Sequence, residues 1–99
     1  MSMDRIIREE ARYIVLRALN DTPDYTLSDA LLERFLEEFG IRRSREFVRS
    51  ELSYLADIGA VTVKKFETTS IAKVTQRGRD HVARKIVLDG VKRPNPEGE

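Results

Sequence analysis

The chain of 99 residues has room for one small domain, and its 40% of hydrophobic residues suffice for a thin core. Charged residues make up 35% of the chain and nearly cancel, to a net charge of +1. The absence of cysteine excludes disulfides, thiol catalysis and cysteine-ligated metal centres. No segment has the pattern of a signal peptide or a membrane-spanning helix, so we expect a soluble, intracellular protein without a membrane partner.

The balanced total charge hides an asymmetry between the two halves of the chain. Residues 1–40 carry five arginines against nine acids, whereas residues 41–99 carry thirteen lysines and arginines against eight acids. This distribution allows one side of the protein to face a polyanion while the other side avoids it.

Apolar residues at helical spacing predict a first helix over residues 3–20. Its core stripe comprises Ile7, Ala11, Ile14 and Ala18. Four more apolar side chains lie well off that stripe: Ile6, Tyr13, Leu16 and Leu19. A helix that is apolar over so much of its circumference is buried on more than one side. The cover comes either from a second copy of the chain or from neighbouring elements of the same subunit.

A short segment with strand character, residues 25–27, precedes the second predicted helix. Ser28 or Asp29 can cap that helix, because either side chain can accept from a free backbone N–H. The helix is expected to run to Phe39, and Gly40 follows at the position where a left-handed conformation favours glycine.

After a short turn, Ser44 is expected to cap a third helix that ends near Ile58. Its predicted core face comprises Val48, Leu52 and Leu55, widened by Phe47 and Ile58. Two helices joined by a turn of three or four residues that contains glycine match a helix-turn-helix unit.

Two segments rich in β-branched residues, 60–66 and 70–75, predict a β-hairpin with a three-residue loop. A last helix is expected from Gln76 to about Leu88, stopped by the Asp-Gly pair at 89–90. The order of elements predicts a mainly α, α+β winged helix-turn-helix domain over residues 1–90, with a flexible polar tail at 91–99. Its predicted core joins Ile7, Ile14, Leu32, Phe35, Leu36, Val48, Leu52, Leu55 and Val82.

Three stretches of the chain resemble a known family: RRSREFVRSELSYLADIGAV (42–61), VTQRGRDHVAR (74–84) and DGVKRP (89–94). They are similar to small proteins of Mu-like prophages that are loosely described as ArsR-like or winged-helix regulators. VTQRG is also similar to the strand-to-helix junction of the MarR and PadR types. The resemblance implies a winged-helix fold, a phage origin and a place in the cytoplasm of a bacterial host. With no cysteine and one histidine, the metal sensing that the ArsR label suggests has no support in this chain.

The third helix is the predicted recognition helix. Its solvent side presents Glu46, Arg49, Ser50, Ser53 and Asp57. Arg49 can fork onto a guanine edge, and Ser50 and Ser53 can contact bases or phosphates. The alternative interpretation is an ordinary solvated helix face.

Arg42, Arg43 and Arg45 cluster at the start of this helix, where cations oppose the helix dipole. Contact with phosphate would explain them, because a helix N-terminus binds anions through its free N–H groups. The alternative is pairing with Glu37 and Glu38 at the end of the preceding helix.

Three lysines, Lys64, Lys65 and Lys73, are expected on the hairpin. A basic wing would provide a second anchor on the DNA backbone, whereas lysines on an exposed strand also prevent edge-to-edge aggregation. His81 has no second histidine or cysteine nearby, so neither a catalytic nor a metal role is expected. We expect no enzyme activity, no cofactor and no small-molecule ligand, because no catalytic or phosphate-cradling motif is present.

Two functions stay open at this point. The first is binding of double-stranded DNA as a phage transcriptional regulator or accessory factor, favoured by the basic second half and the arginine cluster. The second is an adaptor between proteins in phage morphogenesis or packaging, favoured by the acids Glu46, Glu51 and Asp57 on the third helix. A homodimer through the first and last helices is also expected, because Val87 and Leu88 would need cover as the off-stripe residues of the first helix do.

Overall fold

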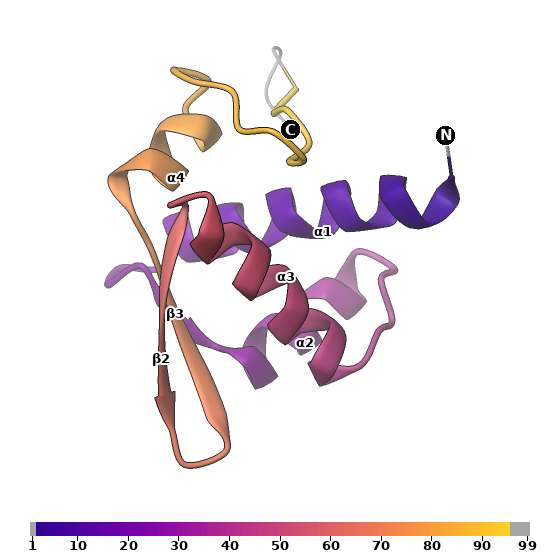
Figure 1. The fold of residues 1–99 in the computed structure, drawn as a ribbon, viewed down its shortest axis with the longest axis vertical. Coiled ribbons are helices and arrows are strands. Elements are labelled where there is room, and N and C mark those ends of the chain that lie inside the picture. The colour runs from indigo at the N-terminus through magenta and orange to yellow at the C-terminus, as the bar shows by residue number, and fades with distance from the viewer. Residues whose placement is uncertain (1, 96–99) are drawn as a thin grey trace.

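Four helices and a three-stranded antiparallel sheet form an α+β fold in residues 2–95, the part of the chain that the computed structural model describes (Figure 1). In chain order the elements are α1 (Met3–Asn20), β1 (Thr26–Ser28), α2 (Asp29–Glu38), α3 (Arg45–Asp57), β2 (Val61–Phe66), β3 (Thr69–Val74) and α4 (Gln76–Val82). None of these helices is long and apolar enough to cross a membrane.

Each helix begins at a hydroxyl side chain that accepts a hydrogen bond from the backbone N–H three residues further along. These caps are Ser2 for α1, Ser28 for α2, Ser44 for α3 and Thr75 for α4. Such a cap satisfies one of the N–H groups that a helix start leaves without a partner. Of the two residues considered for α2, Ser28 is therefore the cap, and Asp29 is free to turn inward.

The sheet has the order β1-β3-β2, so the short first strand completes the hairpin as expected. Leu27 of β1 and Val63 of β2 both lie opposite Ala72 of the central strand. The hairpin turn is tighter than predicted, because Phe66 pairs with Thr69 and only two residues connect the strands. Glu67, the first of those two, has a φ of 56°. A positive φ at this position is typical of two-residue hairpin turns whose backbone twist matches that of the flanking strands.

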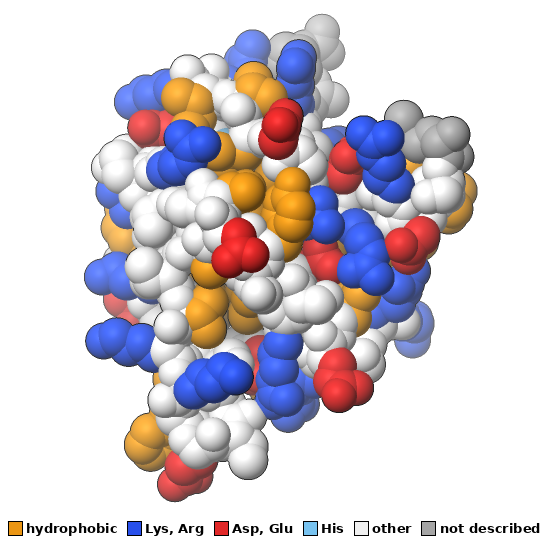
Figure 2. Space-filling view, in the orientation of Figure 1, with side chains coloured by type: hydrophobic (Ala, Val, Ile, Leu, Met, Phe, Trp, Pro, Cys, Tyr) orange, Lys and Arg blue, Asp and Glu red, His pale blue; other side chains and the backbone are white. Residues whose placement is uncertain are grey.

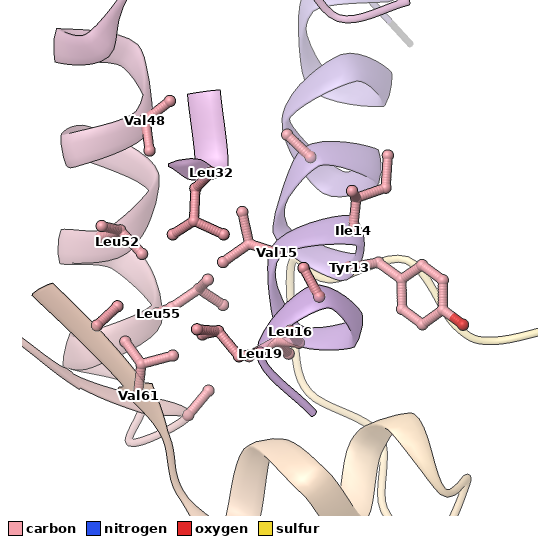
Figure 3. Close-up of a cluster of buried hydrophobic side chains, with 14 of the residues drawn as sticks. Tyr13, Ile14, Val15, Leu16, Leu19, Leu32, Val48, Leu52, Leu55 and Val61 are labelled. Atoms are coloured by element: carbon pink, nitrogen blue, oxygen red, sulfur yellow. The ribbon is translucent and has the colours of Figure 1, made fainter. Parts of the chain in front are cut away.

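The core forms around α1, which α2, α3, β3 and α4 contact (Figure 3). Leu19 of α1 points toward Leu55 of α3, whereas Tyr13 points the other way, toward the segment that follows α4. Tyr13, Leu16, Leu19 and Leu88 are buried within one subunit, whereas Ile6 is 42% exposed and Val87 58%. Cover by the same subunit is thus the correct alternative for the first four, and the predicted dimer through the first and last helices keeps only Ile6 and Val87 as its basis.

The predicted core is confirmed with one exception. Six of the nine predicted residues are buried: Ile14, Leu32, Leu36, Val48, Leu52 and Leu55. Two more, Ile7 and Val82, are partly buried and pack against the edge of the core. The assignment of Phe35 to the core is wrong, because 37% of its surface is exposed. It lies on a side of α2 where it contacts Phe39 instead of the core.

The last helix is shorter than predicted, since α4 ends at Val82 and not at Leu88. Arg84 takes a φ of 65°, and its N–H bonds back to the carbonyl of His81, while the N–H of Lys85 bonds to the carbonyl of Asp80. This paired arrangement is a Schellman motif, with an arginine where glycine is usual.

The ordered chain continues beyond the predicted domain boundary at Gly90. Val91 is buried in the core, and the backbone N–H of Lys92 bonds to the carbonyl of Glu9 in α1. The predicted tail therefore begins with residues that pack against the fold. Its last part, residues 96–99, lies outside the described residues.

Truncation of Leu52 tests the position of the core face on α3. Leu52 is almost fully buried, so Leu52→Ala should lower the free energy of unfolding by about 2–5 kcal/mol through lost burial and a residual cavity. Val87→Ala is the matched control, because Val87 is exposed and its truncation should change the stability by less than about 0.5 kcal/mol. Urea unfolding followed by circular dichroism measures both, and equal stabilities of the two variants would contradict the assigned core face.

Candidate nucleic-acid interface

The exposed side of α3 and the β2–β3 hairpin lie next to each other on one face of the molecule (Figure 1). Lysine and arginine side chains occupy the hairpin side and the opposite flank of this face, with acids between them (Figure 2). We refer to this surface as the α3–hairpin face. Of the residues that the sequence analysis assigned to DNA contact, some are exposed on this face and others are bound to carboxylates or backbone groups of the same chain.

The hairpin lysines do not act as one cluster, because the strand register places them on two sides of the sheet. Lys73 pairs across the sheet with Thr62, and Lys64 pairs with Ile71, which puts both lysines on the face turned away from the core. Together with Thr26 these residues line a hollow of about 260 Å³. Lys65 pairs with Ser70 and lies on the inner side near the hairpin tip.

Arg49 connects three elements instead of extending freely from α3. Its Nε donates to the carboxylate of Asp29 at 2.8 Å, and its Nη2 donates to the carbonyl of Thr68 at 2.6 Å. The same Asp29 carboxylate accepts from the backbone N–H of Ser70 at 3.2 Å. Arg49 therefore fixes the hairpin relative to α3 and to the start of α2.

The environment of Asp29 favours its charged form. Burial raises the pKa of this carboxyl, but hydrogen bonds from Arg49 and from the N–H groups of Ser70 and Ala30 outweigh it, so the pKa of Asp29 lies below its ordinary value of 3.8. Its place in the first turn of α2 is also favourable, because the N-terminal end of a helix attracts negative charge.

Arg43 in the turn before α3 and Arg45 at the first position of α3 have carboxylate partners, but not the predicted ones. Arg45 donates from Nε to Glu33 of α2 at 2.9 Å, and Arg43 lies 3.5 Å from Asp4 of α1. The guanidinium of Arg43 also stacks on the ring of Phe47, 4.8 Å from its centroid. The pairing alternative thus describes these two side chains, with Glu33 and Asp4 in place of Glu37 and Glu38.

Arg42 differs from its neighbours, because it is exposed and forms no hydrogen bond or ion pair with any described residue. Ser53 is equally exposed on the outer side of α3. The hydroxyl of Ser50 lies 2.8 Å from the carbonyl oxygen of Phe47, so its proton is used within the helix. Arg42 and Ser53 are therefore more readily available to a ligand than Ser50.

Sequence reasoning placed Glu51 among the surface acids of the third helix, and this was wrong. Only 2% of its side chain is exposed, and its carboxylate binds Arg8 and Arg12 of α1, the latter from Nε at 2.6 Å. The sequence spacing could have revealed this burial, because Glu51 follows Val48 by three residues and precedes Leu55 by four and so shares the core face of the helix.

Arg12 extends the contacts of Glu51 to the end of the chain. Its guanidinium stacks on the ring of Tyr54 at 3.7 Å from the centroid and donates from Nη1 to the carbonyl of Gly90 at 2.8 Å. The hydroxyl of Tyr54 bonds in turn to the carbonyl of Asp89 at 3.0 Å. This group of residues ties α1, α3 and the segment after α4 together.

His81 is fully buried and has a structural role. Its Nδ1 accepts from the N–H of Leu88 at 3.1 Å, so its Nε2 carries the proton and donates to the carbonyl of Lys92 at 2.9 Å. These two bonds hold the segment after α4 against the core. Among the described residues, no group of three histidine or acidic side chains could hold a metal ion.

Lowering the pH should weaken the link between Asp29 and Arg49. A carboxyl whose pKa is lower in the folded state contributes stability above its ordinary pKa of 3.8, and this contribution is lost as the pH falls through the lower folded value. The stability difference between the wild type and Asp29→Asn should therefore be constant above about pH 5 and should shrink below about pH 4. Ser53→Ala, at an exposed position on α3 and without an ionisable group, is the control whose difference should stay constant.

Loss of the Glu51 carboxylate should destabilise the whole domain. Glu51→Gln leaves two arginines beside a buried neutral amide, so we expect the free energy of unfolding to fall by about 2–4 kcal/mol, less than for a fully buried pair because Arg8 is partly exposed. Glu46→Gln on the exposed side of the same helix should change the stability by less than about 0.5 kcal/mol. Denaturant unfolding compares them, and similar values would show that Glu51 carries no special stabilisation.

No protein-family profile matches the chain, and no solved structure matches it. The chain is 32% identical over 91 residues to uncharacterized protein gp26 of Escherichia phage Mu, an overlap that covers 92% of this chain and 94% of gp26. It is 30% identical over 98 residues to an uncharacterized protein of Haemophilus influenzae, covering 98% of this chain and 95% of the relative. The expected relation to Mu-like phages is confirmed, and the chain belongs to the family of small proteins that includes gp26 of phage Mu.

Proposed function

We propose that the chain is a winged-helix protein that binds double-stranded DNA, with α3 as the recognition helix and the β2–β3 hairpin as the wing. The element order, the antiparallel sheet β1-β3-β2 and the turn between α2 and α3, with Gly40 at a φ of 83°, support this assignment. In a phage such a protein would act as a transcriptional regulator or as an accessory DNA-binding factor.

The observation that carries the proposal is the position of exposed cations on both sides of α3. Arg42 lies just before its N-terminus, and Lys65 lies on the inner side of the hairpin near its tip, while Lys64 and Lys73 lie on the outer side of the same hairpin. All four are exposed, and none forms an ion pair with a described carboxylate. A helix inserted between two strands of phosphates needs cations at these flanking positions.

The paired arginines have different roles in this proposal. Half of the Arg45 side chain is exposed, so its ion pair with Glu33 is weak and can give way to a phosphate. Arg49, in contrast, bonds to a buried carboxylate and to the hairpin turn. We therefore assign Arg49 to positioning the wing against α3, and leave base contacts to Ser53 and to Glu46, whose carboxylate can accept from a cytosine amino group.

The adaptor function is the second candidate. It is favoured by the pairing of Arg43, Arg45 and Arg49 with acids, which reduces the positive charge left for a polyanion. The exposed acids Glu46 and Asp57 on α3 would then belong to a face that binds another protein.

Salt dependence of DNA binding separates the two candidates. Fluorescence anisotropy of a labelled duplex of mixed sequence, at about 50–200 mM salt, should give a linear fall of log affinity with log salt. Arg42→Ala and Lys64→Ala should each flatten that slope by about 0.9, because each removes one phosphate contact. Lys85→Ala, at an exposed lysine beyond α4, is the matched control and should leave the slope unchanged. No binding by the wild type at about 50 mM salt and micromolar protein would contradict DNA binding and favour the adaptor.

A further inference from the structure

Three large apolar side chains remain exposed along one face of α2, two of them within the helix and the third, Phe39, at its C-cap. Leu31 is 51% exposed, Phe35 37% and Phe39 50%, and they follow one another at intervals of four residues. The rings of Phe35 and Phe39 meet edge to face, with their centroids 5.2 Å apart. These residues, here named the α2 stripe, form a continuous apolar ridge along the helix.

The ridge has a hollow on each side. A hollow of about 350 Å³ separates Leu31 and Phe35 from Ala18 of α1 and Leu27 of β1. A second one, of about 340 Å³, lies on the other side, where Arg34, Glu37 and Glu38 join the same two apolar residues. Helices pack against each other by placing the ridge of one into a groove of the other, so this surface can accept a second helix.

We propose that the α2 stripe is an interface with a second copy of this chain, in which two α2 helices pack antiparallel about a two-fold axis near Phe35. The spacing of the stripe is symmetric about Phe35, so Leu31 of one copy would lie opposite Phe39 of the partner subunit. One surface would then serve both copies, as a two-fold interface requires.

The charges beside the stripe support a second copy over an unrelated partner. Arg34, Glu37 and Glu38 lie on the same flank, with Glu38 four residues after Arg34, and none of the three forms an ion pair with a described residue. Two antiparallel helices bring equivalent flanks together with their directions reversed. With the axis between Phe35 and Leu36, Arg34 lies within about 1.5 Å along the helix of direct opposition to Glu38 of the partner subunit, and the same contact recurs on the other side of the axis. Each Arg34 thus meets an acidic flank of the partner subunit.

This dimer differs from the one that the sequence suggested and is compatible with the α3–hairpin face. Glu33, which contacts Arg45 of α3, lies on the opposite side of α2 from Phe35. The contact is also small, because three apolar side chains per copy cover much less than the roughly 800 Å² per partner of a standard interface. We therefore expect weak, reversible association. It does not depend on DNA binding.

Charge reversal at the flank gives a decisive experiment. Sedimentation equilibrium of the full chain, from about 10 µM to 1 mM and at low salt, should show the wild type passing from 11.4 kDa toward twice that mass. Arg34→Glu and Glu38→Arg each place like charges across the axis, so each should weaken association at least about ten-fold. Lys85→Glu is the control for a single charge reversal and should leave association unchanged.

Recombining the charges distinguishes the proposed geometry from a general charge effect. The double variant Arg34→Glu with Glu38→Arg restores both pairs and should dimerise like the wild type, and an equal mixture of the two single variants should form mixed dimers. Circular dichroism checks that the variants fold, as expected for exposed positions. A wild type that stays monomeric at 1 mM would overturn the proposal. So would dimerisation that neither single variant weakens, or weakening that the double variant and the mixture fail to reverse.

Discussion

The position of α3 depends on two buried carboxylates, one on each side of it, that are neutralised by arginines. Glu51 binds Arg8 and Arg12 and joins α3 to α1, while Asp29 binds Arg49 and joins α3 to α2 and the hairpin. A buried charge is tolerated only when it is paired and hydrogen-bonded. This condition is met, because no buried side-chain polar atom among the described residues lacks a partner. The two sites therefore fix the orientation of α3 that apolar packing alone would leave less defined.

This arrangement changes how the charge of the chain is to be interpreted. Arginines that the sequence presents as a basic cluster are partly used inside the fold, and Arg49 is the clearest case because its partner Asp29 is buried. On the α3–hairpin face, the cations that remain available are Arg42 and the hairpin lysines. Binding of a polyanion to the α3–hairpin face would thus depend on backbone contacts at its two margins, with few groups for reading bases between them.

The sequence predicted the order and the starts of the elements well, because these depend on local signals. Hydroxyl caps, Gly40 and the alternation along the strands act within a few residues of each other. The prediction failed where contacts with residues distant in the sequence determine the local structure. Apolar spacing suggested that the last helix continues to Leu88, yet His81 and the core bind that segment as a loop. Glu51 was taken as a surface acid because its arginines lie some forty residues away in the chain.

The same distinction explains why the candidate site was only partly predictable. Exposure of Arg42 and the lysines follows from their place on loops and strands, whereas the partners of Arg43 and Arg45 are set by how α1 and α2 pack beside α3. Phe35 was assigned to the core because nothing in α2 alone tells an uncovered apolar face from a covered one. If two copies cover that face, each α3–hairpin face remains open, and a dimer would present two of them to one duplex. In such an arrangement the fraction of DNA bound would rise more steeply with protein concentration, without any new contact to the DNA.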